Sequence, residues 1–324
     1  MPLPAATLRF PYERVLLNRT RLAYVHLNNL LTDAKRERGA RIYGYVAVWL
    51  PEEFLLLYLQ EGEVVNATAS TDGNHFRALP IAEALAKVPS AAEFGEICFH
   101  RCEDEQLATM YWSQVGEPLA WPSELSVHDP SAVLGFLLAT MHDGVVEVRA
   151  EGGFSYGIVR NGRVVRGFFA DQGVGAADAR LGVLITAPRG ASAARLWPVP
   201  APLPVQAPPG LIQAYRDLMA AVVKRLVADG GDGAPAVAEH ARKLLCAQHV
   251  VLERMALSHP NPRDPVTETH ALTAAIGAWL GELLWASAPQ GATPSTLIGE
   301  LTRDRRHMFQ SAGLFEALPW KVEW

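Results

Sequence analysis

Two similar hairpin sequences constrain the fold of this chain more than any other feature. The stretches FLLLYLQEGEVVNA at 54–67 and FSYGIVRNGRVVRG at 154–167 each contain an apolar run, a glycine turn, two valines and a second run. The turns contain Gly62 and Gly162, and glycine is favoured there because both central residues of a type I′ turn need positive φ. The two stretches therefore predict an internal duplication of a small unit of helix and strands.

Apolar spacing predicts further elements around each hairpin. An irregular lead-in is expected over 1–17. The alternation at 42–49 is apolar on both sides, which predicts a strand covered on both faces. The other elements predicted for the first copy are strands at 21–27 and 94–102 and helices at 30–38, 79–88 and 103–115. After the second hairpin no matching helix is predicted, and two short strands are expected instead, at 181–186 and 194–197.

The first copy resembles a known bacterial module. Its hairpin turn leads into Val-Val-Asn-Ala at 64–67, which is followed by ALPIAEAL at 78–85 and EFGEICF at 93–99. In this order the elements of residues 18–102 resemble the PatA-like N-terminal domain, whereas the second copy resembles it only over 131–169. The resemblance implies a small α+β domain that accompanies response-regulator and signalling modules and has no known catalytic residues. It therefore transfers no active-site residue to this chain.

A proline-rich stretch separates the two copies from a helical region. Its six prolines disfavour helix and sheet pairing and favour an extended spacer. Beyond it the apolar period becomes helical, which predicts helices at 211–230, 235–257, 267–288 and 295–311. The sequence thus predicts an α+β fold of two tandem sheet-plus-helix repeats followed by a C-terminal all-α helical bundle. Its predicted parts are a first repeat with connector at 1–115, a second, partial repeat at 116–197, a Pro-rich linker at 198–209 and the helical bundle at 210–324.

Composition argues against several classes of protein. A net charge of −5 and a pI near 6.1 argue against a chain that mainly binds nucleic acid, because such domains usually have a pI above about 9. Residues 1–17 lack the pattern of a secretory signal, and the apolar stretch 271–286 is too short to span a membrane. Three cysteines cannot all pair, which favours a reducing compartment. We therefore expect a cytoplasmic protein with no transmembrane segment of its own, peripheral to a membrane only through a partner.

No set of residues in the sequence predicts catalysis or metal binding. Ser155 stands in Gly-Phe-Ser-Tyr-Gly, which matches the nucleophile elbow of serine hydrolases, but a hairpin follows where the elbow needs a helix. Cys98, His100 and Cys102 alternate along a predicted strand, where side chains on one face lie about 6.6 Å apart, too far for one zinc ion to bind all three. We expect strand residues at all four positions, no metal and no cofactor. A serine hydrolase is the weakest alternative.

Two other patterns come near known sites without completing them. His249 and Glu253 would share a face of a helix at 235–257, but His240 is half a turn out of phase with His249. The stretch TASTDG at 68–73 is similar to a cyclic-dinucleotide-binding turn, but it has threonine where an acid or amide is needed and no arginine pair precedes it. We expect neither a metal nor a nucleotide at these positions.

The C-terminal sequence GLFEALPWKVEW carries the candidate partner-binding residues. Tryptophan is enriched where interfaces carry their energy, so we expect Leu318, Trp320 and Trp324 to bind a partner unless the tail folds back on the helical region. The tandem modules and the lack of a catalytic set predict a non-enzymatic adaptor, scaffold or accessory subunit that acts through protein–protein interaction. Its expected partners are other proteins, including a multi-subunit or membrane-associated complex, and not nucleic acid. The alternative is a regulatory module that senses a small ligand between the repeats.

Overall fold

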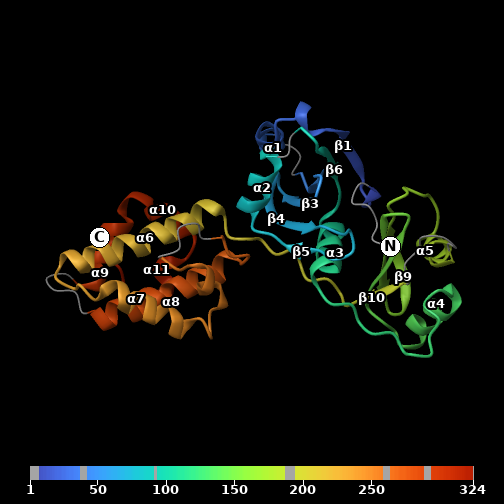
Figure 1. Cartoon of the computed structure of the whole chain (residues 1–324). Coiled ribbons are helices and arrows are strands. Elements are labelled where there is room, and N and C mark those ends of the chain that lie inside the picture. The colour runs from blue at the N-terminus through green and yellow to red at the C-terminus, as the bar shows by residue number, and fades with distance from the viewer. Residues whose placement is uncertain are drawn as a thin grey trace. The chain divides into compact units, whose positions relative to one another are not determined.

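The computed structural model describes residues 7–36, 42–90, 93–186, 194–257, 263–287 and 293–323. Contacts divide the chain into two compact units, whose helices and strands Figure 1 shows. The first holds the described residues of Met1–Leu79 and Ala84–Leu203, and the second those of Pro80–Glu83 and Pro204–Trp324. The class is α+β, as the sequence predicts. Across the described ranges, none of the helices combines the length with the apolar composition that a membrane span requires.

The first unit contains a six-stranded antiparallel sheet with helices on both faces. Its elements are β1 (Arg14–Arg21), a 3-10 turn (Leu22–Tyr24), α1 (Leu27–Arg36), β2 (Gly44–Trp49), β3 (Phe54–Gln60), β4 (Glu63–Ser70), β5 (Arg77–Ala78), the part of α2 (Ile81–Ser90) from Ala84 on, β6 (Glu96–Arg101) and α3 (Asp104–Val115). The strand order is β1-β6-β2-β3-β4-β5. Val46 and Val48 of β2 pack in one core with α1 and α2, whereas Tyr45 and Ala47 pack in another with α3. The strand predicted within 42–49 is therefore covered on both faces, as expected.

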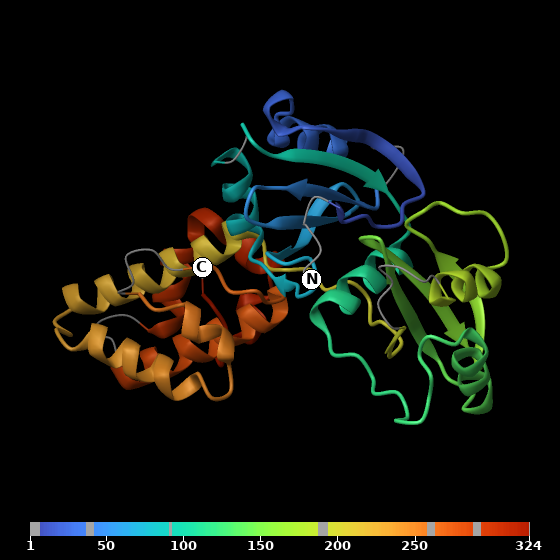
Figure 2. The ribbon, with the colours of Figure 1, turned by 45° about the vertical axis from the view of Figure 1, so that its right-hand side comes forward.

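The first unit also contains a four-stranded antiparallel sheet. Its elements are α4 (Pro130–Ala139), β7 (Gly144–Ala150), β8 (Gly153–Arg160), β9 (Arg163–Phe168), α5 (Ala177–Thr186) and β10 (Arg195–Trp197), with the strand order β10-β7-β8-β9. Helices α4 and α5 lie on one face of this sheet (Figure 2) and share a core with Val146, Val148 and Val159. The opposite face, with Val145 and Tyr156, belongs to the core that contains α3.

Both predicted hairpins form with the predicted turn geometry. The central residues have positive φ in each, at 52° for Glu61 and 79° for Gly62, and at 49° for Asn161 and 74° for Gly162. A register shift follows the same position of β3 and β8, two residues before the strand ends. The type I′ prediction is therefore confirmed, because both central residues of each turn have the positive φ that this turn type requires.

The prediction of a strand at 181–186 is wrong, because this segment belongs to α5. Leu181 and Ile185 lie one helical turn apart and are both buried against the sheet, at 0% and 3% exposure. A short apolar run such as Val-Leu-Ile fits a strand or a helix equally well by pattern alone. The strand predicted at 194–197 is present as β10 and pairs with β7. The second sheet therefore does have a helix and a closing strand after its hairpin.

The strand predicted at 21–27 lies seven residues earlier, as β1, and α1 already begins at Leu27. β1 pairs with β6 at the edge of the six-stranded sheet, with Arg14 opposite Arg101 and Arg21 opposite Glu96. Most of its side chains are exposed or half-buried. Its sequence, RVLLNRTR, lacks the clean alternation by which a half-buried strand is recognised, which explains the error.

Phe10, from the predicted irregular lead-in, connects the two sheets. Its ring stacks on Phe54 of β3 with 5.7 Å between centroids and on Phe154 of β8 with 4.5 Å, at interplanar angles of 13° and 16°. Phe76 packs edge-on against all three rings. A backbone hydrogen bond joins the same segments, since the N–H of Phe154 donates to the carbonyl of Arg9 at 2.9 Å. Phe10 is thus part of the core that both sheets share.

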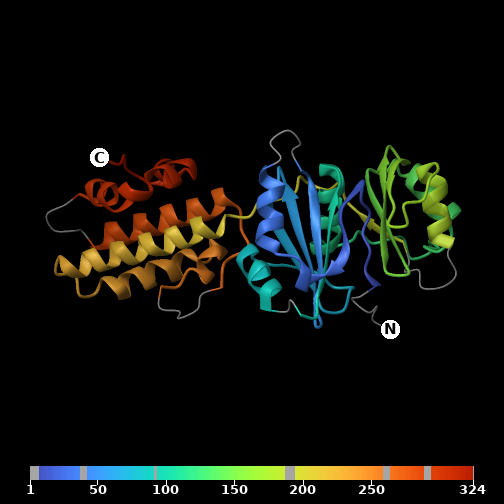
Figure 3. The same ribbon diagram turned by 90° about the horizontal axis from the view of Figure 1, so that it is seen from above.

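The second unit is helical in its described residues. Its elements are α6 (Pro209–Ala228), α7 (Ala234–Leu245), a 3-10 helix (Val250–Arg254), α8 (Thr269–Ser287), α9 (Pro294–Thr302), a 3-10 turn (Arg303–Arg305), α10 (Arg306–Ser311) and α11 (Leu314–Ala317). Figure 3 shows α6, in yellow, running alongside α7 and α8, in orange. Trp279 of α8 is fully buried and donates from Nε1 to the carbonyl of Ala238 in α7 at 2.8 Å.

Two predicted helices of this unit are shorter than expected. The helix predicted over 235–257 ends at Leu245, because the chain turns back there and Arg242 donates to the carbonyl of Leu252 at 2.7 Å. The helix predicted over 295–311 is divided between α9 and α10 by the 3-10 turn. The apolar residues keep a helical spacing beyond the point where each helix ends. Their spacing therefore does not predict where a tertiary contact or a local turn ends the helix.

Phe10→Ala is expected to destabilise the first unit by about 3–5 kcal/mol, because it removes a buried ring and leaves a cavity between two sheets. Phe94→Ala is the matched control, since Phe94 lies in the same unit but is 78% exposed. Urea unfolding followed by near-ultraviolet circular dichroism measures both. Equal effects of the two substitutions would contradict the linking role of Phe10.

Candidate functional site

A cavity of about 230 Å³ lies in the first unit, beside α3. It is formed where α3 ends, where β7 and β10 pair, and where the chain leaves β10. Its walls are mainly apolar, with two tryptophans and two prolines. The lining residues are Thr109, Trp112, Ser113, Gly116, Glu117, Val145, Trp197, Pro198, Val199, Pro200 and Ala201. The first residues of the predicted linker therefore form a wall of a cavity.

The two tryptophans of the cavity are held by different means. Trp112, on α3, donates from Nε1 to the carbonyl of Ala201 at 2.8 Å, which ties the helix to the segment after β10. Its ring also meets Tyr111 edge-on, with 5.4 Å between centroids. Trp197 is the last residue of β10, where it pairs with Val145 of β7 and is 6% exposed. Both side chains are thus fixed in place by the sheet and the helix.

The cavity offers aromatic faces and one carboxylate. Glu117 is exposed and is the one ionisable residue in its lining. The hydroxyls of Thr109 and Ser113 donate to carbonyls of their own helix, at 2.7 Å to Glu105 and 3.0 Å to Met110. Neither hydroxyl is shown bonded to a side chain of this lining that could act as its base. The arrangement therefore favours ligand binding over covalent catalysis.

A buried ion pair that the sequence patterns did not predict lies close to this cavity. Glu147 and Arg149 alternate along β7, are 0% and 3% exposed, and pair with 2.6 Å between Oε1 and Nε. Burial raises the pKa of Glu147, although Arg149 and the Ser113 hydroxyl act in the opposite direction. The guanidinium of Arg149 also lies over the ring of Phe154, 4.4 Å from its centroid. The signal was present in the sequence, since two charges of opposite sign stand two apart in an otherwise apolar strand.

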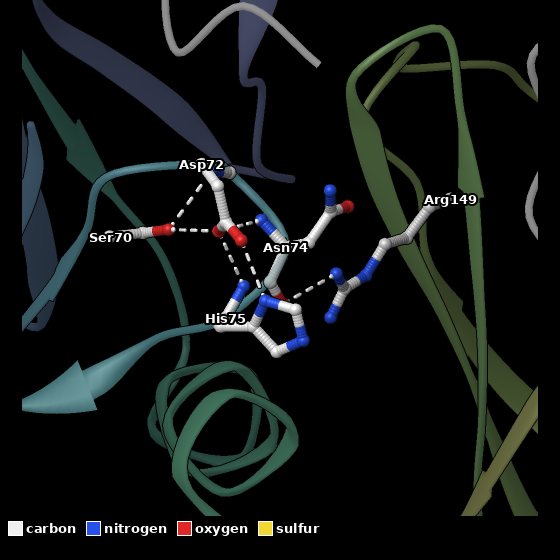
Figure 4. A network of polar contacts seen from close by, with 6 residues as sticks. Ser70, Asp72, Asn74, His75 and Arg149 are labelled. Atoms are coloured by element: carbon white, nitrogen blue, oxygen red, sulfur yellow. Dashed lines mark hydrogen bonds and ion pairs between the residues drawn. The ribbon is translucent and has the colours of Figure 1, made fainter. Parts of the chain in front are cut away.

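The turn after β4 ties the two sheets together, as Figure 4 shows. Asp72 Oδ1 accepts from the backbone N–H groups of Asn74 and His75, both at 2.8 Å, and Oδ2 lies 2.6 Å from His75 Nδ1. Burial raises the pKa of Asp72, but these bonds outweigh it and hold the pKa well below its usual range. Arg149 Nη1 donates to the carbonyl of Asn74 at 3.1 Å. Ser70 Oγ bonds to Asp72 and not to His75, so the group is a structural turn and not a catalytic triad.

Ser155 lies in the middle of β8 and is 4% exposed. It pairs with Val148 of β7, and its Oγ accepts from the backbone N–H of Ala170 at 3.2 Å. A nucleophile elbow needs a sharp turn from a strand into a helix, with the hydroxyl exposed. The position of Ser155 inside a strand lacks both features.

Cys98 and His100 lie on β6, and their surroundings favour a role in the fold over a role in catalysis or metal binding. Burial raises the pKa of Cys98 to about 12 and raises the pKa of Cys102, so neither thiol supplies a thiolate readily. His100 Nδ1 lies 2.8 Å from the hydroxyl of Tyr45. In the second unit, α7 ends before His249, so the helix on which the predicted pairing with Glu253 depends does not extend that far. Within the described ranges, no three side chains of metal-ligand type form a group that could hold a metal ion.

His100→Gln is expected to reduce the loss of stability in acid. Burial lowers the pKa of His100 from 6.5 to about 4, so between these pH values the unfolded chain binds more protons at this site than the folded one. The contribution of neutral His100 to the free energy of unfolding is therefore fully present above pH 6.5, and it is lost as the pH falls towards 4. The loss is about 2 kcal/mol once partial exposure of the ring is allowed for. Urea unfolding of both proteins at pH 7 and pH 4.5 measures it, and parallel pH profiles would contradict the assignment.

The C-terminal tail packs on the second unit. Leu318 is 7% exposed in the core, and Trp320 is half-buried against the same core. Trp324 lies outside the described residues. Ser295 Oγ donates to the carbonyl of Lys321 at 2.6 Å and accepts from the N–H of Glu323 at 2.8 Å. These contacts account for Leu318 and Trp320 without a partner, and their binding of a partner stays a prediction.

Gly299→Ala is expected to release the tail, because a Cβ there would overlap the backbone carbonyl oxygen of Glu323. Gly210→Ala is the matched control, since that helical glycine has no atom within 4 Å of its added Cβ. Alanine favours a helix by about 1 kcal/mol over glycine, so Gly210→Ala is expected to be neutral or stabilising. Limited trypsinolysis after Lys321 measures tail release. Equal cleavage rates in the two variants would contradict the packing.

Trp285, which sequence analysis did not single out, is the most exposed aromatic side chain among the described residues, at 82%. It lies near the end of α8, whose sequence is largely apolar, as is typical of a buried helix. Trp279, Leu280 and Leu283 are indeed fully buried, but Ala274 and Trp285 face solvent. The spacing of apolar residues could not reveal this, because apolar residues occur on every side of the helix.

A comparison with protein families, curated proteins and solved structures finds no match to this chain. The resemblance of residues 18–102 to the PatA-like N-terminal domain therefore stays an expectation. The candidate sites are defined by their own geometry alone.

Proposed function

We propose that this chain is a non-enzymatic adaptor or accessory subunit that binds another protein through the exposed face of α8. The observation that carries the proposal is Trp285, four-fifths of which is in contact with solvent. Exposed tryptophan is uncommon on a surface without a partner and is enriched where interfaces carry their binding energy. The neighbouring exposed residues of α8 are small or acidic, namely Ala274, Glu282 and Ala286, with Ala278 and Gly281 half-buried.

The composition of α8 supports a partner on this face. A helix that is apolar on one side needs one covered face, whereas α8 carries apolar residues on every side, and Glu282 is the acidic residue on its exposed side. Small side chains at Ala274 and Ala278 would let a partner backbone approach closely, with Trp285 filling a hollow on its surface. The tail residues Leu318 and Trp320 would support this surface from within, and Trp324 keeps its predicted role in partner binding.

We also propose the finer architecture that the sequence predicts, with two tandem PatA-like repeats before a C-terminal helical bundle. The support is that Gly62 and Gly162 both occupy type I′ turns, and that the N–H of each donates to a carbonyl ahead of β2 or β7, that of Ile42 or His142. We place the protein in the cytoplasm, peripheral to a membrane through its partner. The free thiols of Cys98, Cys102 and Cys246 support a reducing compartment.

Trp285→Ala is expected to weaken partner binding at least about tenfold, because hot-spot tryptophans contribute about 2 kcal/mol or more. The tagged full-length chain is purified gently from its own cells, from soluble and membrane fractions separately, and co-purifying proteins are quantified by mass spectrometry. Leu244→Ala, on α7 and 63% exposed, is the matched control. Both substitutions should leave the melting temperature nearly unchanged, because exposed side chains contribute little to stability.

The outcomes separate clearly. A stoichiometric partner that is lost with Trp285→Ala and kept with Leu244→Ala would support the adaptor function and its surface. A partner kept by both variants would place the interface elsewhere, for which the tail is the next candidate. A chain that purifies alone from both fractions would contradict the adaptor function.

A second candidate function is a regulatory module that senses a small ligand. The cavity beside α3 favours it, because an apolar hollow with aromatic walls and a few polar groups is the usual form of a small-molecule site. Binding there would alter the contact between α3 and the segment after β10. A serine hydrolase through Ser155 has no such support.

A further inference from the structure

We propose that the cavity beside α3 binds a small organic cation that carries a methylated ammonium group. The proposal rests on the second candidate function, ligand sensing, and is independent of partner binding through Trp285. Three properties of the cavity lead to it: its charge, its aromatic walls and its fixed shape.

The charge of the lining favours a cation. Glu117 is its one ionisable residue, and the other polar side chains, Thr109 and Ser113, are neutral hydroxyls. An anionic ligand would meet an unfavourable carboxylate and no compensating lysine or arginine in this lining. A neutral ligand could gain at most a hydrogen bond to Glu117, whereas a cation also gains an electrostatic attraction at the rim, which exposure of Glu117 weakens but does not remove.

The aromatic walls favour a methylated ammonium over a lysine-like amine. Trp112 and Trp197 both line the cavity, and the face of an indole ring attracts a cation more strongly than that of any other side chain. A primary amine would have to replace its water with acceptors for three N–H groups, and most of the lining around it is apolar. A trimethylammonium group has no N–H to satisfy and presents methyl groups to apolar walls such as Val145. This match of charge and surface defines the ligand class.

The fixed shape of the cavity keeps the binding cost low. Pro198 and Pro200 restrict the backbone of one wall, and the bond from Trp112 Nε1 to Ala201 holds that wall against α3. Little conformational entropy is therefore lost when a ligand enters. The volume, about 230 Å³, suits a molecule of the size of choline and is small for a nucleotide.

The test uses choline and its neutral isostere, 3,3-dimethylbutan-1-ol, titrated into the ¹⁵N-labelled full chain. The readout is the indole N–H signal of Trp112, assigned by its absence in Trp112→Leu. Choline is expected to shift this signal with a Kd of about 1 mM, and the neutral isostere at least about fivefold more weakly. Glu117→Gln should weaken choline binding about threefold, while Glu124→Gln, at an exposed acid between α3 and α4, should not.

Each outcome decides the proposal. Choline binding that exceeds that of the isostere and falls with Glu117→Gln supports it. Equal binding of choline and the isostere overturns it in favour of an ordinary apolar cavity, and no shift with either compound overturns it altogether. A stronger response to phosphatidylcholine vesicles than to choline would overturn the assignment to a free small molecule. None of these results alters the capture experiment on Trp285, so failure of one proposal is distinguishable from failure of the other.

Discussion

The stacking of Phe10 between Phe54 and Phe154 is the contact on which the first unit depends. Each sheet has a helix-covered face of its own, but the other faces are covered in common, by Phe10, by α3 and by each other's side chains. Burial of apolar area drives this association without fixing its geometry, because the hydrophobic effect has no direction. The parallel rings and the bond from Phe154 to Arg9 supply the direction.

The buried ion pair of Glu147 and Arg149 also fixes how the two sheets pack together. Glu147 and Arg149 lose their hydration in the core, and a buried ion pair regains that cost only with good geometry and further hydrogen bonds. Arg149 meets this condition by pairing with Glu147, lying over Phe154 and donating to Asn74. Misplaced packing of the sheets would leave it unpaired at a cost of several kcal/mol. The ion pair therefore contributes less to the free energy of unfolding than to the choice of this packing of the two sheets over others.

The two proposed binding regions follow from two different kinds of incomplete burial. In the first unit, α3 and the segment after β10 meet around rigid tryptophan and proline side chains, which leave a hollow that neighbouring groups cannot fill. In the second unit, α8 is apolar on more faces than its neighbours cover, so Trp285 remains in solvent. A hollow takes a small ligand, whereas a protruding aromatic needs a complementary surface on another protein. The two functions are compatible in one chain.

The sequence by itself determined the features that depend on neighbouring residues. The Gly62 and Gly162 turns, the α+β class and most helices follow from residue choice and spacing over a few positions, and the structure has them. Tertiary structure decided whether the run around Leu181 became a helix or a strand, because its apolar side chains suit either until a sheet lies against them. It also decided the stacking of Phe10, the cavity beside α3 and the exposure of Trp285. These depend on which segments distant in the sequence meet, and no local pattern carries that information.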